Sequence, residues 1–499
     1  MRLILVFIIF QASLAFANKV AKTPRFSSKS QNIGQLQLSA HGLKVNRLLN
    51  QAIANMQSEN YSEARTMLRQ SIALAPECRF CYLSLAFVAL QESLHRNVNL
   101  WDESRENLLV AYKLPVKNPR WHDYTIDRIR KYLVSESPQN MKEIHRQLFF
   151  ILQKQYKKNP ENTSLKLFYG EVLLANIRYF LKKKKTIDQF SQKFESVIDI
   201  RDNNFQPLVL RFLYLRYLQI LDLKPELRTY LGKASKQLPN DIGYYPREIA
   251  KGYILIGQYT KAKEYIKDAI ERDEIYFKSK KIKDARSYYE EGYLFNFYLL
   301  WFISLLNSQK EEAKKIYVSL SKLAKRVAGA PTLTWYQSMP LIRMAYFGEW
   351  REILDFEASS LSAYTSSYYH FARGLAYASQ KEYLLGISQL KAINKLSRKE
   401  SSPLEKALHE LSGKFLTAYI RWRQGKMKDS LYLFKAASTL EKKFSRSYTF
   451  LWLFFSRYFI AQIYEQRFQK LKASEEYKKV QDKWPNIVKV KNRLDALRR

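Results

Sequence analysis

Glycine and proline are scarce in this chain, which has only 14 of each among its 499 residues. These residues mark turns and loops, so a long chain with few of them is typical of helices joined by short connections. Lys, Leu, Glu, Gln, Arg and Ala dominate many windows of the sequence, and all are good helix formers. Since 46% of the residues are hydrophobic, the chain can bury a large core, and the composition favours an all-α fold.

Long apolar runs are missing after the first seventeen residues. The stretch that comes closest, LFNFYLLWFISLL at 294–306, is too short to cross a bilayer, so we do not expect an integral membrane protein. Residues 1–17 combine a positive start, an apolar run and a final Ala-Phe-Ala, the pattern of a secretory signal peptide. We expect cleavage before Asn18, a flexible polar leader at 18–40, and a periplasmic or secreted protein.

Sequence motifs for catalysis are also lacking. The six histidines include no pair at a spacing of three or four residues, which a helical metal site needs. No Gly-rich phosphate loop, G-x-S-x-G or H-E-x-x-H occurs. We therefore expect no enzyme, no cofactor and no bound metal, and the alternative is an enzyme whose site assembles only from dispersed residues.

Acidic residues are outnumbered, with 46 of them against 84 Lys and Arg, giving a formal charge of +38. The excess has two explanations. It reflects either the composition of the chain as a whole or an anionic partner, such as an envelope lipid, a glycan or an acidic protein. An exported protein rarely meets nucleic acid, so we expect no nucleic-acid partner.

Small and aromatic residues recur at fixed offsets in five stretches of the chain. The second stretch, for example, carries Ala250, Gly257, Tyr259, Ala262 and Ala269. Small residues are needed where two antiparallel helices approach most closely, since a large side chain would separate their backbones. The five stretches are VNRLLNQAIANMQSENYSEARTMLRQSIALAP (45–76), PREIAKGYILIGQYTKAKEYIKDA (246–269), SYYHFARGLAYASQKEYLLGISQLKAI (367–393), GKFLTAYIRWRQGKMKDSLYLFKAA (413–437) and RYFIAQIYEQRFQKLKASEEYKKVQDKWP (457–485).

These offsets resemble the tetratricopeptide repeat (TPR), a helix-turn-helix unit of about 34 residues. The resemblance implies an α-solenoid, a superhelix of antiparallel helix pairs. It covers about two thirds of the mature chain, with partly degenerate repeats at 41–240 and more regular ones at 241–499. More loosely, the chain resembles long bacterial exported TPR proteins with irregular repeats, in which a His tends to lie near the stretch that here reads GYYPREIAKGY (243–253). Tyr244, Tyr245 and Arg247 stand there instead, so any His-dependent chemistry of such relatives is not expected.

The only two cysteines, Cys78 and Cys81, are spaced C-x-x-C at the expected start of a helix. Haem attachment requires a following His, but residue 82 is Tyr, and zinc requires further ligands that are absent. A redox dithiol remains open, although no strand-like context surrounds the pair. We expect a local disulfide in an oxidising compartment, or two small buried side chains.

A TPR superhelix presents a concave face lined by the first helix of each pair. We expect that groove to bind an extended peptide or an amphipathic helix of a protein partner, so that the chain serves as a non-enzymatic scaffold. Some of these side chains could instead belong to the inter-helix core. The candidate groove residues are Phe371, Leu375, Phe415, Tyr419, Trp422, Arg423, Tyr458 and Gln462.

Overall fold

The structure, a computed structural model, confirms the all-α class: its described residues form helices and contain no strand. The predicted signal peptide (1–17) and all but the last residue of the predicted leader (18–40) lie outside the described part. The described residues are 40–57, 61–96, 100–116, 122–128, 141–180, 184–198, 208–235, 243–279, 292–325, 336–357, 363–399, 403–447 and 452–498.

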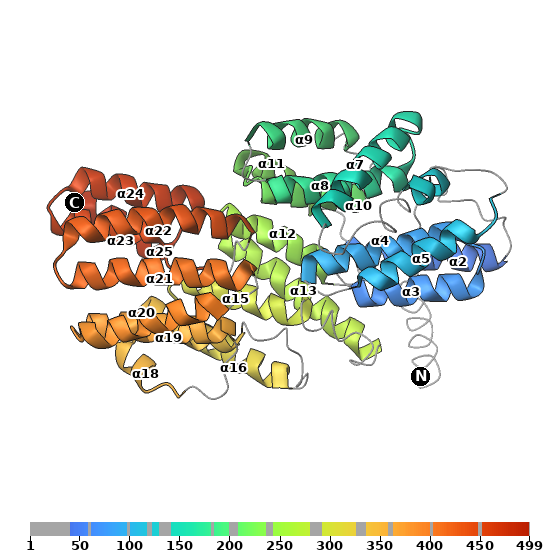
Figure 1. Ribbon diagram of the computed structural model, residues 1–499. Coiled ribbons are helices and arrows are strands. Elements are labelled where there is room, and N and C mark those ends of the chain that lie inside the picture. Colours follow the sequence, from blue (N-terminus) through green and yellow to red (C-terminus); the bar gives the residue numbers. More distant parts are fainter. Residues whose placement is uncertain are drawn as a thin grey trace, which may run out of the picture. The chain divides into compact units, whose positions relative to one another are not determined.

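The helices belong to two compact units, residues 1–56 with 64–205, and residues 57–63 with 206–499. The division between the units falls at 205/206, because α10 and α11 pack on α12. The helices before that boundary are α2 (Ala40–Gln57), α3 (Tyr61–Leu74), α4 (Arg79–Arg96), α5 (Trp101–Lys113), α7 (Met141–Lys158), α8 (Thr163–Phe180) and α9 (Lys184–Val197) (Figure 1).

In the second unit, sequence neighbours pack as pairs, and each pair packs on the next. This is the TPR-like solenoid arrangement that the small-residue pattern predicts. Its helices are α10 (Leu208–Ile220), α11 (Lys224–Ala234), α12 (Tyr244–Leu255), α13 (Tyr259–Ser279), α15 (Leu294–Leu306), α16 (Lys310–Lys325), α17 (Met339–Phe347), α18 (Trp350–Leu354), α19 (Ala363–Ser379), α20 (Tyr383–Lys399), α21 (Pro403–Arg423), α22 (Met427–Ser447), α23 (Ser456–Gln466), α24 (Lys470–Lys483) and α25 (Val488–Arg498).

Small residues lie where the helices approach most closely, as the sequence predicts. A Cβ on Gly374 of α19 would lie 2.4 Å from a methyl group of Leu416 on α21, and one on Gly252 would lie 2.8 Å from Leu231. Larger side chains at these positions would push the helices apart. The alanines of the predicted pattern are fully buried, namely Ala52, Ala64, Ala250, Ala262, Ala269, Ala418, Ala437, Ala461 and Ala473.

Seven helix-helix connections in the described part of the second unit have the same kind of tight turn. Each contains a residue in the left-handed region, and the next N–H donates to a carbonyl five residues back, as from Gln258 to Tyr253 and from Gln469 to Tyr464, both at 2.9 Å. This hydrogen bond closes the end of the first helix of each pair. The left-handed residues are Asp222, Gly257, Ser308, Gly348, Lys381, Gly425 and Phe468.

The segment 482–490, here called the closing segment, packs back against the α12–α13 turn, α13 and α15. The Tyr259 hydroxyl donates to the carbonyl of Pro485 at 2.6 Å, and the Asn486 side chain donates to the carbonyl of Gly257 at 3.0 Å. Trp484 is buried against Phe302, with ring centroids 5.5 Å apart. In an open repeat array each repeat contacts only its neighbours. The closing segment differs, because it also contacts residues 226 and 229 positions earlier in the chain.

Two glycines with the same backbone geometry allow a test of this closure. Gly257 and Gly425 both lie near φ +75° to +79°, but a Cβ on Gly257 would lie 2.7 Å from Pro485, and one on Gly425 would meet nothing. We expect Gly425→Ala to lower the free energy of unfolding by about 1 kcal/mol through backbone strain alone. Gly257→Ala should lose at least ~1 kcal/mol more, since overpacking adds to the strain. Urea unfolding followed by circular dichroism measures both, and equal losses would contradict the closing contact.

Candidate interaction surface

The structure places most of the predicted groove residues inside the core. Their exposed fractions run from 0% for Phe371 and Phe415, through 2% for Leu375, to 5% for Tyr419 and Tyr458. Phe371 and Phe415 face each other across α19 and α21, with ring centroids 5.6 Å apart. A partner cannot reach these five side chains in this structure.

The reason is that the chain covers this side of α19 and α21 with its own residues. Trp452 and Phe454, in the extended segment before α23, are both buried. The ring of Phe371 lies 5.3 Å from that of Trp452 and 5.0 Å from that of Phe454, and Phe415 contacts the same two rings. Trp452 and Phe454 therefore cover Phe371 and Phe415, which the sequence predicts as part of a binding groove.

The other three predicted residues stay accessible and lie on the neighbouring helices α21 and α23. Arg423 is exposed, and Trp422 and Gln462 are partly exposed. The Trp422 indole donates to the Gln466 side chain at 2.8 Å, and its ring meets the partly exposed Phe459 ring edge-on at 5.9 Å. Together Trp422, Arg423, Phe459, Gln462 and Gln466 form what we call the α21/α23 surface.

Phe459 and Gln466 did not enter the sequence-based candidate set, although their spacing could have identified them. Phe459, Gln462 and Gln466 follow one another at three and four residues, so they lie on one face of α23. A second partly exposed stripe was missed on α19. There the Arg373 guanidinium lies 5.3 Å from the Tyr369 ring centre and 5.5 Å from that of Tyr377.

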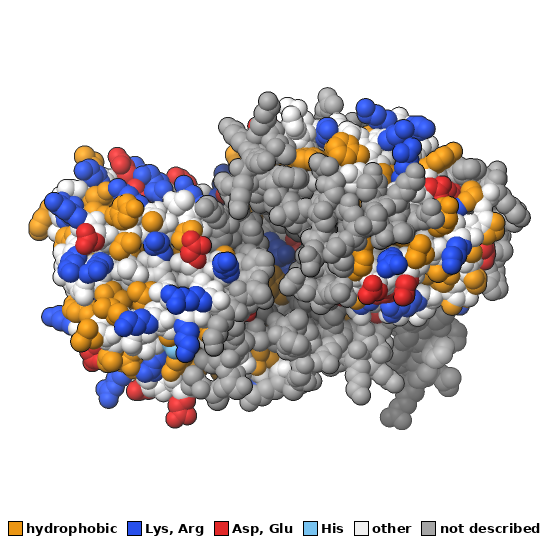
Figure 2. Space-filling view, viewed as in Figure 1, with side chains coloured by type: hydrophobic (Ala, Val, Ile, Leu, Met, Phe, Trp, Pro, Cys, Tyr) orange, Lys and Arg blue, Asp and Glu red, His pale blue; other side chains and the backbone are white. Residues whose placement is uncertain are grey.

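Accessible side chains on the C-terminal helices are of mixed character. Figure 2 shows Lys and Arg side chains interspersed with hydrophobic ones over the described parts of α20 to α24, on the side of the molecule that faces the viewer. Such a surface offers apolar contact area together with positive charge, whereas a groove lined only by buried aromatic residues offers neither to a partner.

Partly buried ionisable groups gather at the closing segment. The ammonium group of Lys489 lies 5.1 Å from the Tyr346 ring centre and 4.9 Å from that of Tyr458. Burial, and secondarily the nearby Arg493, lower the pKa of Lys489 to about 8. Burial also raises the pKa of Glu441 and lowers that of Lys483, whose charges partly compensate each other.

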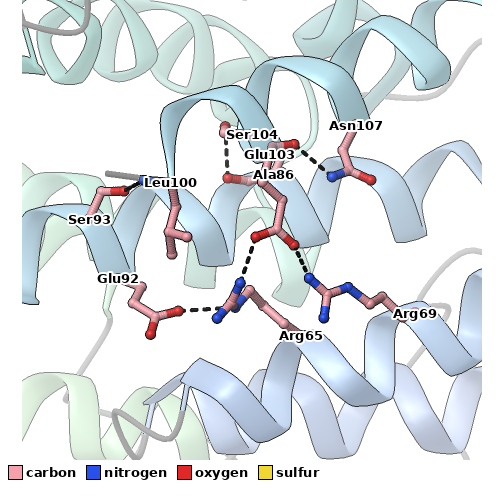
Figure 3. A network of polar contacts seen from close by, with 9 residues as sticks. All are labelled: Arg65, Arg69, Ala86, Glu92, Ser93, Leu100, Glu103, Ser104 and Asn107. Atoms are coloured by element: carbon pink, nitrogen blue, oxygen red, sulfur yellow. Dashed lines mark hydrogen bonds and ion pairs between the residues drawn. The ribbon is translucent and has the colours of Figure 1, made fainter. Parts of the chain in front are cut away.

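In the first unit, polar contacts join α3, α4 and α5 (Figure 3). Arg65 pairs with Glu92 at 3.0 Å and with Glu103, which also pairs with Arg69. The Ser104 hydroxyl donates to the carbonyl of Ala86 at 3.0 Å. Each carboxylate pairs with a guanidinium from another helix. We therefore interpret the cluster as a structural contact between these helices and not as a binding site.

Cys78 and Cys81 form a disulfide at the start of α4. Both are buried, with 7% and 0% exposure, and the Cys81 N–H donates to the Cys78 sulfur at 3.2 Å. Of the alternatives left open by the sequence, this bond corresponds to the local disulfide. It joins the first turn of α4 to the residue before the helix.

The described residues offer neither a metal site nor a membrane-spanning helix. They contain no group of three or more His, Cys, Asp or Glu side chains placed to hold a metal ion. None of the described helices combines the length and the apolar character that a bilayer crossing requires.

Comparisons with known proteins give little guidance. No protein-family model matches the chain, and no curated protein is similar to it. Among solved structures, the crystal structure of the yeast Tom70 is similar at 11% sequence identity, covering 91% of this chain and 89% of that one, with a TM-score of 0.34. A similarity at this level supports no conclusion about what this chain binds.

The disulfide lies in the first unit, where it should contribute to stability. We expect Cys81→Ser to lower the free energy of unfolding by about 2 kcal/mol, since the bond restricts the unfolded chain. Thermal melts with and without a reducing agent measure this loss, and partner capture by the same variant should equal that of the wild type. A loss of capture with an unchanged melt would instead indicate a functional thiol.

Lys489 should make stability depend on pH in the alkaline range. The pKa of its ammonium group is about 8 in the folded chain, compared with the ordinary value of 10.5 that applies to the unfolded chain. Between these values the unfolded chain binds more protons, so stability contributed through this group rises from pH 8 to 10.5. Below pH 8 the folded chain carries the full penalty of a partly buried charge.

Lys489→Met removes this penalty. We expect the variant to be more stable than the wild type at neutral pH by about 1 kcal/mol, discounted because the side chain is partly exposed. The advantage should shrink as the pH rises, as urea unfolding at a series of pH values would show. Lys491→Met, exposed on the same helix, is the matched control, and a pH-independent difference at Lys489 would contradict the argument.

Proposed function

We propose that this chain is an exported, non-enzymatic helical-repeat scaffold that binds a protein partner through the α21/α23 surface. The proposal rests on one observation: Trp422, Arg423 and Gln462 remain accessible and lie next to one another, joined to Phe459 and Gln466. The absence of catalytic sequence motifs supports the non-enzymatic part, and the pattern of residues 1–17 supports export.

The chemistry of this surface suits protein recognition. Trp and Arg are the residues most often found at the energetic centres of protein interfaces. The Arg423 guanidinium lies 6.0 Å from the Trp422 ring centre, so the cation and the aromatic face form one patch. Gln462 and Gln466 add amide donors and acceptors that can pair with the backbone of an extended peptide.

A crosslinking pull-down from the cell-envelope fraction tests the proposal. We expect Trp422→Ala and Arg423→Glu each to reduce the yield of a specific crosslinked partner roughly tenfold, the effect of losing an energetic centre. Arg423→Glu is the more informative change, because the side chain is exposed and its loss removes one hydrogen bond, to the carbonyl of Ser379.

Tyr432→Ala and Lys435→Ala, both on the exposed side of α22, are the matched controls and should capture the partner as the wild type does. Equal yields from all variants would exclude the α21/α23 surface as the binding site. Screening the purified chain for hydrolase and transferase activity would separately test the non-enzymatic part.

A further inference from the structure

Three consecutive turns of the second unit lie in a row. They are the α19–α20 turn (379–385), the α21–α22 turn with the start of α22 (421–432), and the α23–α24 turn (465–472). The Tyr383 hydroxyl donates to the carbonyl of Arg423 at 2.6 Å, and Arg423 donates to the carbonyl of Ser379 at 3.2 Å. The bond from Trp422 to Gln466 joins the second turn to the third. These bonds hold the three turns side by side.

Large apolar side chains project from this row. Leu384 is 84% exposed, Phe468 is 93% exposed and Leu471 is 83% exposed, which are the highest values among the large hydrophobic residues described. Phe468 also occupies the left-handed position of its turn, at φ 59°. That conformation is unfavourable for a bulky residue, and the side chain gains no packing within the chain to offset it.

The charges around these side chains are mostly positive. The three turns carry eight Lys and Arg but only Glu382, Asp429 and Glu465 as acids. Glu465 already pairs with Arg493 at 3.6 Å. None of the eight cations pairs with a carboxylate within the described part of the chain. They are Lys381, Arg421, Arg423, Lys426, Lys428, Arg467, Lys470 and Lys472.

We propose that this turn-tip surface, formed by Leu384, Phe468, Leu471 and the eight cations, docks on a membrane that carries anionic lipids. Side chains that project singly from turns can enter the boundary between headgroups and acyl chains, while the flanking cations attract the headgroups. Protein interfaces instead bury their central residues in well-packed pockets. In Figure 2, blue and orange side chains lie next to one another at the left margin, over the ends of α20 to α24.

This proposal concerns the tips of the turns, whereas the protein partner proposed above binds the faces of α21 and α23. Arg423 belongs to both surfaces, so the vesicle experiment below leaves it unchanged. It also assigns a role to part of the +38 charge, for which the sequence left open a compositional and an electrostatic explanation. The attachment is peripheral: the apolar tips enter only the interface, and the cations remain at the headgroups.

Co-sedimentation of the purified chain with vesicles tests the proposal. We expect binding to vesicles of phosphatidylcholine with phosphatidylglycerol and much weaker binding to phosphatidylcholine alone. Raising the salt from about 0.1 M to 0.5 M should weaken binding strongly, because it shortens the Debye length. Leu384→Ser, Phe468→Ser and Leu471→Ser combined should reduce vesicle partitioning roughly tenfold or more. The double change Lys470→Glu and Lys472→Glu should reduce vesicle partitioning about fivefold or more per substituted residue.

Matched controls use similar changes elsewhere on the second unit. Ile275→Ser replaces an apolar residue that is 59% exposed on α13, and Lys267→Glu with Lys278→Glu makes the same charge change on that helix. Both controls should bind vesicles as the wild type does. Since all the substituted side chains are exposed, circular dichroism and thermal melts should show every variant folded.

Three results would overturn the proposal. One is vesicle binding that the turn-tip variants leave unchanged, and another is equal binding to neutral and anionic vesicles. The third is binding to a soluble polyanion such as heparin that matches vesicle binding and does not depend on Leu384, Phe468 and Leu471. In that case the surface would be a site for anionic polymers and not for a bilayer.

Discussion

The close approach of helices from consecutive pairs is the constraint on which the rest of the second unit depends. Gly374 and Gly252 lie so near the neighbouring leucine side chains that a single added carbon would collide. The same left-handed turn then reverses the chain seven times, with one hydrogen bond sealing the end of each first helix. Because pair spacing and turn geometry are both set in this way, the side chains of consecutive pairs fall into rows. Both surfaces proposed above are such rows: one runs along helix faces, and the other runs along the tips of the turns.

Repeat register could be predicted from the sequence, because it depends on the size of single residues. The alanines at 250, 262, 418 and 461 are buried where the spacing places them. The fate of the first-helix aromatics could not be predicted in the same way. Phe371 and Phe415 are aromatic residues of the kind that line binding grooves. Their burial depends on Trp452 and Phe454, which follow no repeat pattern. The turns could be predicted only in part. Glycines such as Gly257 and Gly425 indicate a left-handed residue in the sequence, whereas Lys381 and Phe468, which adopt the same conformation, do not.

The three structural roles of aromatic residues in this chain explain why composition alone is a poor guide to binding. Some fill the core between pairs, as Phe415 does. Some cover cations, as Tyr346 and Tyr458 do for Lys489. Others, such as Trp422 and Phe468, reach the solvent. A protein partner and an anionic membrane would use different members of this last group, so a chain with both contacts could hold its partner beside a membrane.

The bond between Tyr259 and Pro485 spans 226 residues of sequence, and this separation has a kinetic consequence. Most contacts in a repeat protein are local, so such proteins have low contact order and can nucleate anywhere along the array. Here the contact between Tyr259 and Pro485 closes a loop of the chain that contains most of the unit, and it carries the loop-closure entropy of the residues between them. We expect the unit to mature late, after the segment with Trp484 and Pro485 has been synthesised. Until then Trp484 and Phe302 present apolar surface that chaperones could recognise.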